Sequence, residues 1–202
     1  MPKPVLPQNE RRYFQQEIRL AGGADNKQAV IDGYAAKFNS QSEDLGYFVE
    51  KIAPGAFANT IANDDIRALW NHNWDLILGR NKAGTLRLVE DDTGLKIEID
   101  APDTVCGRDA VESVRRGDVT QMSFGFQTIQ DHWEKVGDTY VRTLLEVKLF
   151  EISPCVYPAY TDTSVSARNL DIFNQAREQL QPPPEVRMDE IEMLALRLRC
   201  AA

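Results

Sequence analysis

The stretch Thr120-Gln121-Met122-Ser123-Phe124-Gly125-Phe126-Gln127 decides most of what this sequence can say about fold and function. Side chains alternate across a β-strand, so one face of this stretch carries the bulky residues Met122, Phe124 and Phe126. Ser123, Gly125 and Gln127 share the other face, where the glycine leaves a gap that a ligand or another backbone can approach. Taken by itself, this stretch favours the interpretation that Ser123 is an ordinary small residue on a half-buried strand. The rest of the chain has to decide whether it is a nucleophile.

The composition indicates one globular body with attachments. The chain has 202 residues, of which 43% are hydrophobic and 27% charged, enough for a substantial core and a well-solvated surface. A net charge of −8 argues against nucleic-acid binding, which normally needs a basic face. No apolar run reaches the roughly 18 residues of a membrane span, and the start of the chain lacks the apolar core of a signal peptide. Cys106, Cys155 and Cys200 show no metal-ligand spacing, so we expect no metal or cofactor and a reducing compartment.

Changes in composition predict three regions. Residues 1–10 are rich in proline and are expected to be flexible. Residues 11–168 contain many short strand patterns with one or two helices inserted, which is typical of a mostly β, antiparallel, barrel-like body. Residues 169–202 form a helical tail in which three prolines separate helices expected at residues 170–180 and 186–198. We expect this tail to dock elsewhere or to be removed.

Local patterns place several elements within the body. Gly33 is a candidate bulge in a strand at residues 29–38, and residues 85–90 and 95–99 form a hairpin. Thr104 is placed to cap a helix that runs to Arg116 and ends at Gly117. Further strands are expected at residues 12–20, 47–52, 66–70, 76–80 and 140–154, and a short helix at residues 56–61.

Two histidines limit the search for a general base, and imidazole is the commonest one. His132 stands beside Trp133 near the end of a hairpin and is expected to be a solvated turn residue. His72 follows an apolar strand and lies between two asparagines and two tryptophans. A lone histidine is more often structural than catalytic, so His72 needs partners to count as a base.

A serine hydroxyl becomes a good nucleophile only when a base takes its proton, and a third group must orient that base. Glu151 stands among the bulky residues of Leu149-Phe150-Glu151-Ile152-Ser153, and this alternation predicts an acid that faces inward. The alternative is a surface charge on an edge strand. Glu146 and Asp162 are the fallback candidates for the third group.

Several blocks, taken together and in order, resemble a known family. They are Pro54-Gly55-Ala56-Phe57, Leu69-Trp70-Asn71-His72-Asn73 with Leu78-Gly79-Arg80, Gln121-Met122-Ser123-Phe124-Gly125-Phe126, and Leu149-Phe150-Glu151-Ile152-Ser153 with Val156-Tyr157-Pro158-Ala159. This combination resembles the signature blocks of tailed-phage prohead (capsid maturation) proteases of the HK97 type, over residues 33–167. Those proteases are related in fold to herpesvirus assemblins, so the resemblance implies an assemblin-like body.

By this resemblance Ser123 is the nucleophile, His72 the general base and Glu151 the group that orients His72. Assemblins use a serine with two histidines, and the second has no counterpart histidine here, because His132 lies in a different context. Glu151 takes the comparable place after the serine strand. Backbone donors for the oxyanion are expected in the turn at residues 157–162, and an exposed strand edge beside the site is expected to take an extended peptide.

The function implied is a serine endopeptidase that cleaves the scaffolding segment of capsid protein inside the immature prohead, in the host cytoplasm. The resemblance also implies self-cleavage, for which the tail is the expected place. It suggests a homodimer as well, because assemblins are activated by dimerisation. A second hypothesis is a non-catalytic assembly module that binds capsid protein through its sheet edge and C-terminal helices. A third, which requires the order of the blocks to be chance, is an unrelated small β-barrel binding protein.

Overall fold

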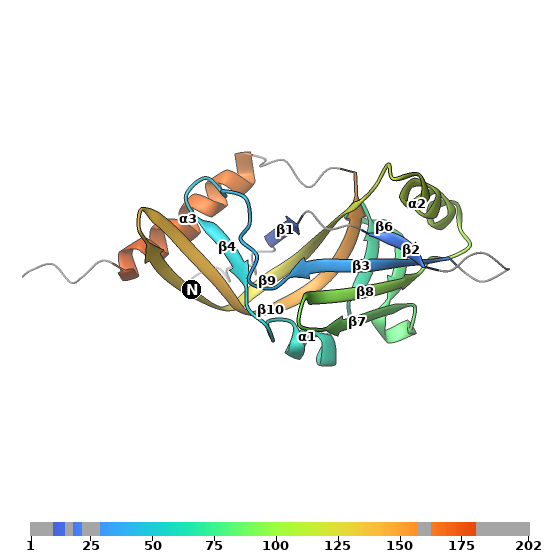
Figure 1. Ribbon diagram of the computed structural model, residues 1–202, viewed down its shortest axis with the longest axis horizontal. Helices are drawn as coiled ribbons and strands as arrows, with labels where there is room; N and C mark the ends of the chain where they lie inside the picture. The colour runs from blue at the N-terminus through green and yellow to red at the C-terminus, as the bar shows by residue number, and fades with distance from the viewer. Residues whose placement is uncertain (1–9, 15–17, 22–28, 157–162, 181–202) are drawn as a thin grey trace, which may run out of the picture.

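The computed structural model of this chain describes residues 10–14, 18–21, 29–156 and 163–180 (Figure 1). The strands are β1 (Glu10–Phe14), β2 (Arg19–Ala21), β3 (Val30–Lys37), β4 (Val49–Ile52), β5 (Arg67–Trp70), β6 (Asn73–Arg80), β7 (Leu86–Glu90), β8 (Gly94–Asp100), β9 (Gln121–Val136) and β10 (Thr139–Cys155). The helices are α1 (Ala58–Asn63), α2 (Val105–Arg116), α3 (Thr163–Leu180) and a 3-10 turn, η1 (Asn81–Ala83). The turn at residues 157–162 and the helix expected at residues 186–198 lie outside the described residues.

The strands form two sheets. The larger has the order β1-β9-β10-β5-β6, with β4 also paired to β10, and the smaller has the order β2-β3-β8-β7. β10 pairs in parallel with β4 and β5, and the other pairs are antiparallel. The predicted mostly β fold with few helices is therefore confirmed. Across the described residues the sheets curl into a half-barrel, and the larger sheet has β1 and β6 at its two ends.

The core contains the apolar face of β9, as its alternation predicts. Met122, Phe124 and Phe126 are fully buried. Phe124 packs edge-on against Phe57 with ring centres 5.7 Å apart, and its ring centre lies 5.1 Å from that of Phe126. Residues of the smaller sheet such as Ile97 belong to the same cluster. Burying a phenylalanine stabilises a fold by about 1.5–3 kcal/mol, so this face holds β9 firmly in place.

Helix α2 begins and ends where the sequence predicts. The Thr104 hydroxyl accepts a hydrogen bond from the Gly107 backbone N–H, at 3.1 Å. Gly117 ends the helix in the left-handed conformation, with φ of 77°, which glycine adopts without a steric penalty. After this helix the chain enters β9 at Gln121.

Three local predictions are wrong. The strand expected at residues 12–20 is two strands, β1 in the larger sheet and β2 in the smaller. The register shift in β3 lies between Tyr34 and Ala36, so the bulge is not at Gly33. His132 lies within β9, paired with Thr143, because the hairpin continues to Gly137 before it turns. Its side chain is exposed, as expected.

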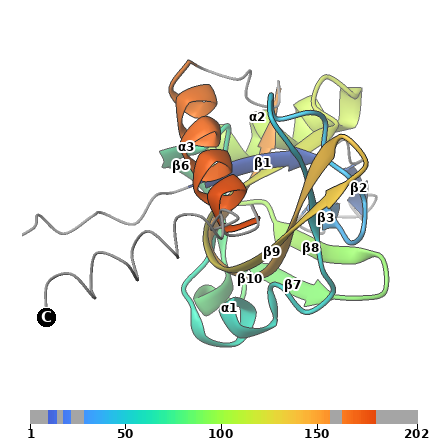
Figure 2. The same cartoon turned by 90° about the vertical axis from the view of Figure 1, so that its left-hand side faces the viewer.

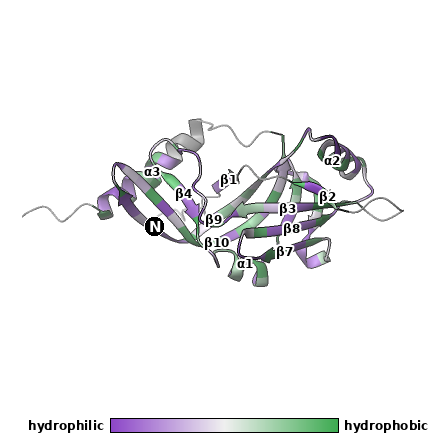
Figure 3. Cartoon of the chain, viewed as in Figure 1, coloured by the Kyte–Doolittle hydropathy of each residue, from purple (hydrophilic) through white to green (hydrophobic). Residues whose placement is uncertain are grey.

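The β9–β10 hairpin extends beyond the core, and its far end is largely hydrophilic (Figure 3). Helix α3, which contains the helix predicted at residues 170–180, runs beside this hairpin (Figure 2). The buried Phe173 fixes it there, with ring centres 5.6 Å from Tyr47 and 4.9 Å from Tyr140. The first part of the predicted tail thus packs on the body.

No helix in the described part of the chain is long and apolar enough to cross a membrane.

Candidate active site

His72 lies in the tight turn between β5 and β6. Trp70 pairs with Asn73, so Asn71 and His72 form a two-residue loop with φ of 51° and 59°. Positive φ at both positions is what a type I′ hairpin turn requires, and Asn and His are among the non-glycine residues that tolerate it best. The Asn71 backbone N–H donates to the Pro154 carbonyl at 3.1 Å, and the Asn71 Oδ1 accepts from the Val156 N–H at 3.0 Å. These bonds tie the turn to the end of β10.

Glu151 faces the site because β10 contains a bulge. Leu149 pairs with Phe126 and Glu151 pairs with Gly125, so Phe150 is an extra residue. Without it, Glu151 would lie on the same face as Leu149, in the core. Plain alternation along this run was therefore the wrong reason to expect an inward-facing acid. The edge-strand alternative is also wrong, because β10 lies between β9 and β5 and Glu151 is only 2% exposed.

The carboxylate of Glu151 contacts His72 and Ser153. The His72 Nδ1 lies 2.7 Å from Glu151 Oε1, and the Ser153 hydroxyl donates to Glu151 Oε2 at 2.5 Å. The Ser153 oxygen also accepts the backbone N–H of His72, at 3.2 Å. Both carboxylate oxygens are thus occupied, and the turn and the acid are held together. The sequence interpretation missed Ser153, although its position two residues after Glu151 places it on the same face.

Gly125 makes room for this carboxylate. A Cβ atom at this position would lie 2.5 Å from Glu151 Oε1, closer than such atoms ever approach. The gap predicted beside Ser123 exists, but it is filled by Glu151 and not by a ligand or another backbone. Any side chain at Gly125 pushes the acid away from His72.

The second ring nitrogen of His72 is free. Nε2 is buried and has no hydrogen-bond partner among the described residues. Buried polar atoms are normally bonded, so an unpaired one calls for an explanation. An ionised carboxylate only accepts hydrogen bonds, so Nδ1 of a neutral His72 donates to Glu151 and Nε2 carries the lone pair. A general base needs that arrangement.

Ser123 lies beside this pair but bonds elsewhere. It is the cross-strand partner of Ser153 and lies on the same face of the sheet as Gly125. Its side chain is fully buried, and its hydroxyl donates to the carbonyl of Arg12 in β1, at 2.9 Å. In the described structure no hydrogen bond joins it to His72. The structure thus brings His72 and Glu151 into contact and places Ser123 on the neighbouring strand.

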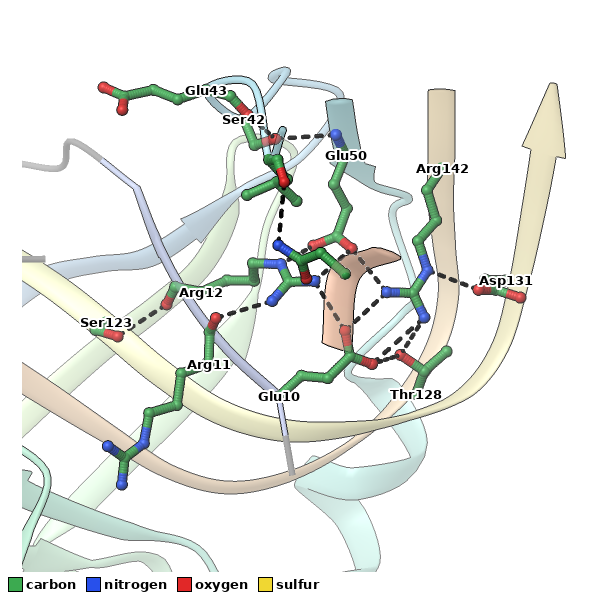
Figure 4. A network of polar contacts seen from close by, with 12 residues as sticks. Glu10, Arg11, Arg12, Ser42, Glu43, Glu50, Ser123, Thr128, Asp131 and Arg142 are labelled. Carbon is green, nitrogen blue, oxygen red and sulfur yellow. Dashed lines mark hydrogen bonds and ion pairs between the residues drawn. The ribbon is translucent and has the colours of Figure 1, made fainter. Parts of the chain in front are cut away.

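Buried ion pairs hold β1 next to β9 (Figure 4). Arg12 lies 2.7 Å from Glu50 of β4 and 2.8 Å from Glu10. Arg142 of β10 lies 2.8 Å from Glu10, 3.0 Å from Glu50 and 2.7 Å from Asp131. Burial alone would raise the pKa of Glu10, but the guanidinium groups of Arg12 and Arg142 outweigh it and hold that pKa below its ordinary value. We call Glu10, Arg12, Glu50 and Arg142 the β1 clamp.

The other predicted candidates do not join the site. Glu146 accepts a hydrogen bond from the Asn59 side chain at 2.8 Å on the exposed surface, and Asp162 lies outside the described residues. Burial and the nearby Asp109 raise the pKa of Cys106, although this residue lies at the start of α2. Burial and Glu151 raise the pKa of Cys155 to about 11. Both thiols therefore stay protonated and unreactive near neutral pH.

Within the described residues, no group of three or more histidine, cysteine, aspartate or glutamate side chains is placed to hold a metal ion.

Comparison with known proteins gives three findings. None of the curated proteins matches the chain. Among solved structures, the bacteriophage T4 capsid assembly protease gp21 is similar, with a TM-score of 0.48 and 10% sequence identity over 74% of this chain and 98% of that one. The family model described as caudovirus prohead serine protease matches residues 15–177, which is most of the chain. The chain therefore belongs to the caudovirus prohead serine protease family.

Proposed function

We propose that this chain is a serine endopeptidase of capsid maturation in which Ser123 is the nucleophile, His72 the general base and Glu151 the group that orients His72. One observation carries most of the proposal: His72 Nδ1 contacts the buried Glu151 carboxylate at 2.7 Å while Nε2 is buried and free. Ser123 and Ser153 lie on that face and pair across β9 and β10. Ser153 already bonds Glu151 and the His72 backbone, which leaves Ser123 for the reaction.

The chemistry follows from this arrangement. As the Ser123 oxygen attacks the substrate carbonyl, its proton passes to His72 Nε2, and the Glu151 carboxylate stabilises the imidazolium that forms. His72 then returns the proton to the leaving amine, and the peptide bond breaks to leave an acyl-enzyme. Water, deprotonated by the same imidazole, releases the acyl group and restores Ser123. For the first step, the Ser123 hydroxyl has to turn from the Arg12 carbonyl towards His72.

The family supports capsid protein as the substrate, and we propose that the chain cuts its scaffolding segment inside the prohead, in the host cytoplasm. We also propose that the chain cleaves itself in the region after residue 167, as a way to release the tail. Association into a homodimer stays a prediction.

Co-expression with the neighbouring capsid protein tests this function. Intact-mass analysis of both chains should show trimming with the native protein and none with Ser123→Ala, because losing the nucleophile of a triad costs on the order of 10⁶ in kcat. Ser113→Ala is the matched control, since Ser113 lies on α2 and its hydroxyl donates only to the Asp109 carbonyl of the same helix. Cleavage by the Ser123→Ala protein contradicts the assignment. Capsid protein that co-purifies uncut with the native chain favours a non-catalytic assembly module.

A further inference from the structure

A peptide carbonyl has to reach Ser123 in any serine protease reaction, and in this structure none can. The Ser123 side chain is fully buried, and its hydroxyl is engaged by the Arg12 carbonyl of β1 at 2.9 Å. Moving β1 would release this hydroxyl from its partner.

β1 occupies the one side of β9 that β10 does not cover. It pairs antiparallel with β9 over five residues, from Glu10 opposite Phe126 to Phe14 opposite Met122, with Ser123 inside this register. β1 is also the outermost strand on this side of the larger sheet. If β1 left, the backbone of β9 would present a free edge beside the nucleophile. Free edges of this kind bind extended peptides as an added strand.

The geometry points to the edge of β9 at Met122–Phe126 as the surface that holds the substrate, as an extended peptide strand that replaces β1. This inference rests on the proposed function and adds how the substrate is recognised. The Arg12 carbonyl lies where a strand-paired substrate would present its own carbonyl to Ser123. β1 and the substrate therefore exclude one another.

The β1 clamp allows this exchange without stranding a buried charge. Glu10 and Arg12 both belong to β1 and lie 2.8 Å apart, so they leave together as a neutral pair. Glu50 and Arg142 stay behind, 3.0 Å apart, as a second neutral pair. Breaking a buried ion network is costly mainly when one charge is left unpaired, and this network divides without doing so.

β1 also lies outside the part of the chain that defines the family. It ends at Phe14, and the family match begins at residue 15. β1, whose carbonyl bonds Ser123, thus precedes the residues that the family model matches, while β9 and β10 lie within them.

The test uses the full chain with Glu10→Gln and Arg12→Gln combined, which weakens the clamp without changing net charge. The control combines Arg87→Gln with Glu98→Gln, an exposed ion pair of the smaller sheet, 2.8 Å apart. A fluorophosphonate reports on access to Ser123, because an activated serine displaces its fluoride and forms a stable adduct. Hydrogen exchange reports separately on whether β1 has loosened and whether the rest of the fold is intact.

We expect the clamp variant to exchange β1 amides faster and to label Ser123 at least about tenfold faster than the native chain and the control. A synthetic peptide of residues 8–16 should slow that labelling, and a scrambled peptide should not. If β1 loosens but the labelling rate of Ser123 does not change, or if the peptide has no effect, substrate does not replace β1. If the β1 amides stay protected in the clamp variant, the β1 clamp is not what holds β1 in place. No labelling of Ser123 despite a loosened β1 contradicts the proposed function itself.

Discussion

The two halves of the candidate site are in different states. The acid–base half is assembled: Glu151 contacts His72 at 2.7 Å, and Ser153 holds the second carboxylate oxygen. The half that holds Ser123, the proposed nucleophile, is closed, because the Ser123 hydroxyl bonds the backbone of β1 instead of His72. The strands of the body assemble the His72–Glu151 pair by themselves, whereas β1 engages the Ser123 hydroxyl.

This contrast has a physical origin. Glu151 and Ser153 lie on the central strand β10, and the turn that carries His72 is bonded to the same strand at Pro154 and Val156. Few of these contacts can change without disrupting the sheet. β1 pairs with β9 alone and sits at the end of the sheet order, so it can exchange while the rest stays in place. His72 is therefore held rigidly, whereas the strand beside Ser123 can move.

Removing the base should have the largest effect on the assembled half. His72→Gln eliminates the proton acceptor, and we expect cleavage to fall on the order of 10⁶-fold, as for the nucleophile, because the two act as a unit. The rate of capsid-protein trimming by purified enzyme measures this, with circular dichroism as the check that the fold is intact. A folded His72→Gln protein that cuts within about tenfold of the native rate would rule out His72 as the base.

Neutralising the acid should have the next largest effect. Glu151→Gln keeps the size of the side chain and removes the charge that orients His72 and stabilises the imidazolium. We expect a loss of about 10⁴-fold in kcat with little change in KM. Steady-state kinetics on a peptide that spans the mapped capsid cleavage site separates the two parameters. A change confined to KM would instead assign Glu151 to substrate binding.

Removing the Ser153 hydroxyl tests how firmly the acid is held. Ser153→Ala leaves Glu151 Oε2 without its donor, and we expect kcat to fall about tenfold, the equivalent of one hydrogen bond. Ser153→Cys, with a weaker donor, should fall between the two. An unchanged kcat with lower thermal stability would indicate that Ser153 only stabilises the fold.

The smallest expected effect is the one on stability when Glu10 of the β1 clamp is neutralised alone. The pKa of Glu10 is lowered in the folded state, so its contribution is present above the ordinary carboxyl pKa and is lost as pH falls through the lowered value. Glu10→Gln should lower the free energy of unfolding by about 2 kcal/mol near pH 7, and the difference from the native chain should shrink as pH falls below the ordinary carboxyl pKa. Urea unfolding at pH 7 and at a series of lower pH values measures this. A difference independent of pH contradicts an ionised, paired Glu10.

Much of the fold could be predicted from local patterns. The alternation around Ser123 gave the buried face of β9, and Thr104 and Gly117 marked the ends of α2, because strand periodicity and helix caps depend on neighbouring residues only. The pairing of His72 with Glu151 followed from the family resemblance and not from spacing.

Other features depend on contacts between distant segments, which no local pattern reveals. The bulge at Phe150 turns Glu151 to the site side, yet no local signal marks it. The pairing of Arg12 with Glu50 joins residues 38 positions apart in the sequence. The Ser123 hydroxyl is engaged because β1 pairs with β9. The sequence predicts a strand at residues 12–20 but does not reveal its partner strand.

The most direct test of the proposed catalytic roles is which serine becomes modified. The full chain, both native and with Glu10→Gln and Arg12→Gln, is treated with a fluorophosphonate, and the adduct is located by peptide mapping. We expect an adduct on Ser123 in both proteins, formed faster in the variant and lost with His72→Gln. An adduct on Ser153, which faces Ser123 across the same strand pair, or an adduct on Ser123 that does not depend on His72, would contradict it.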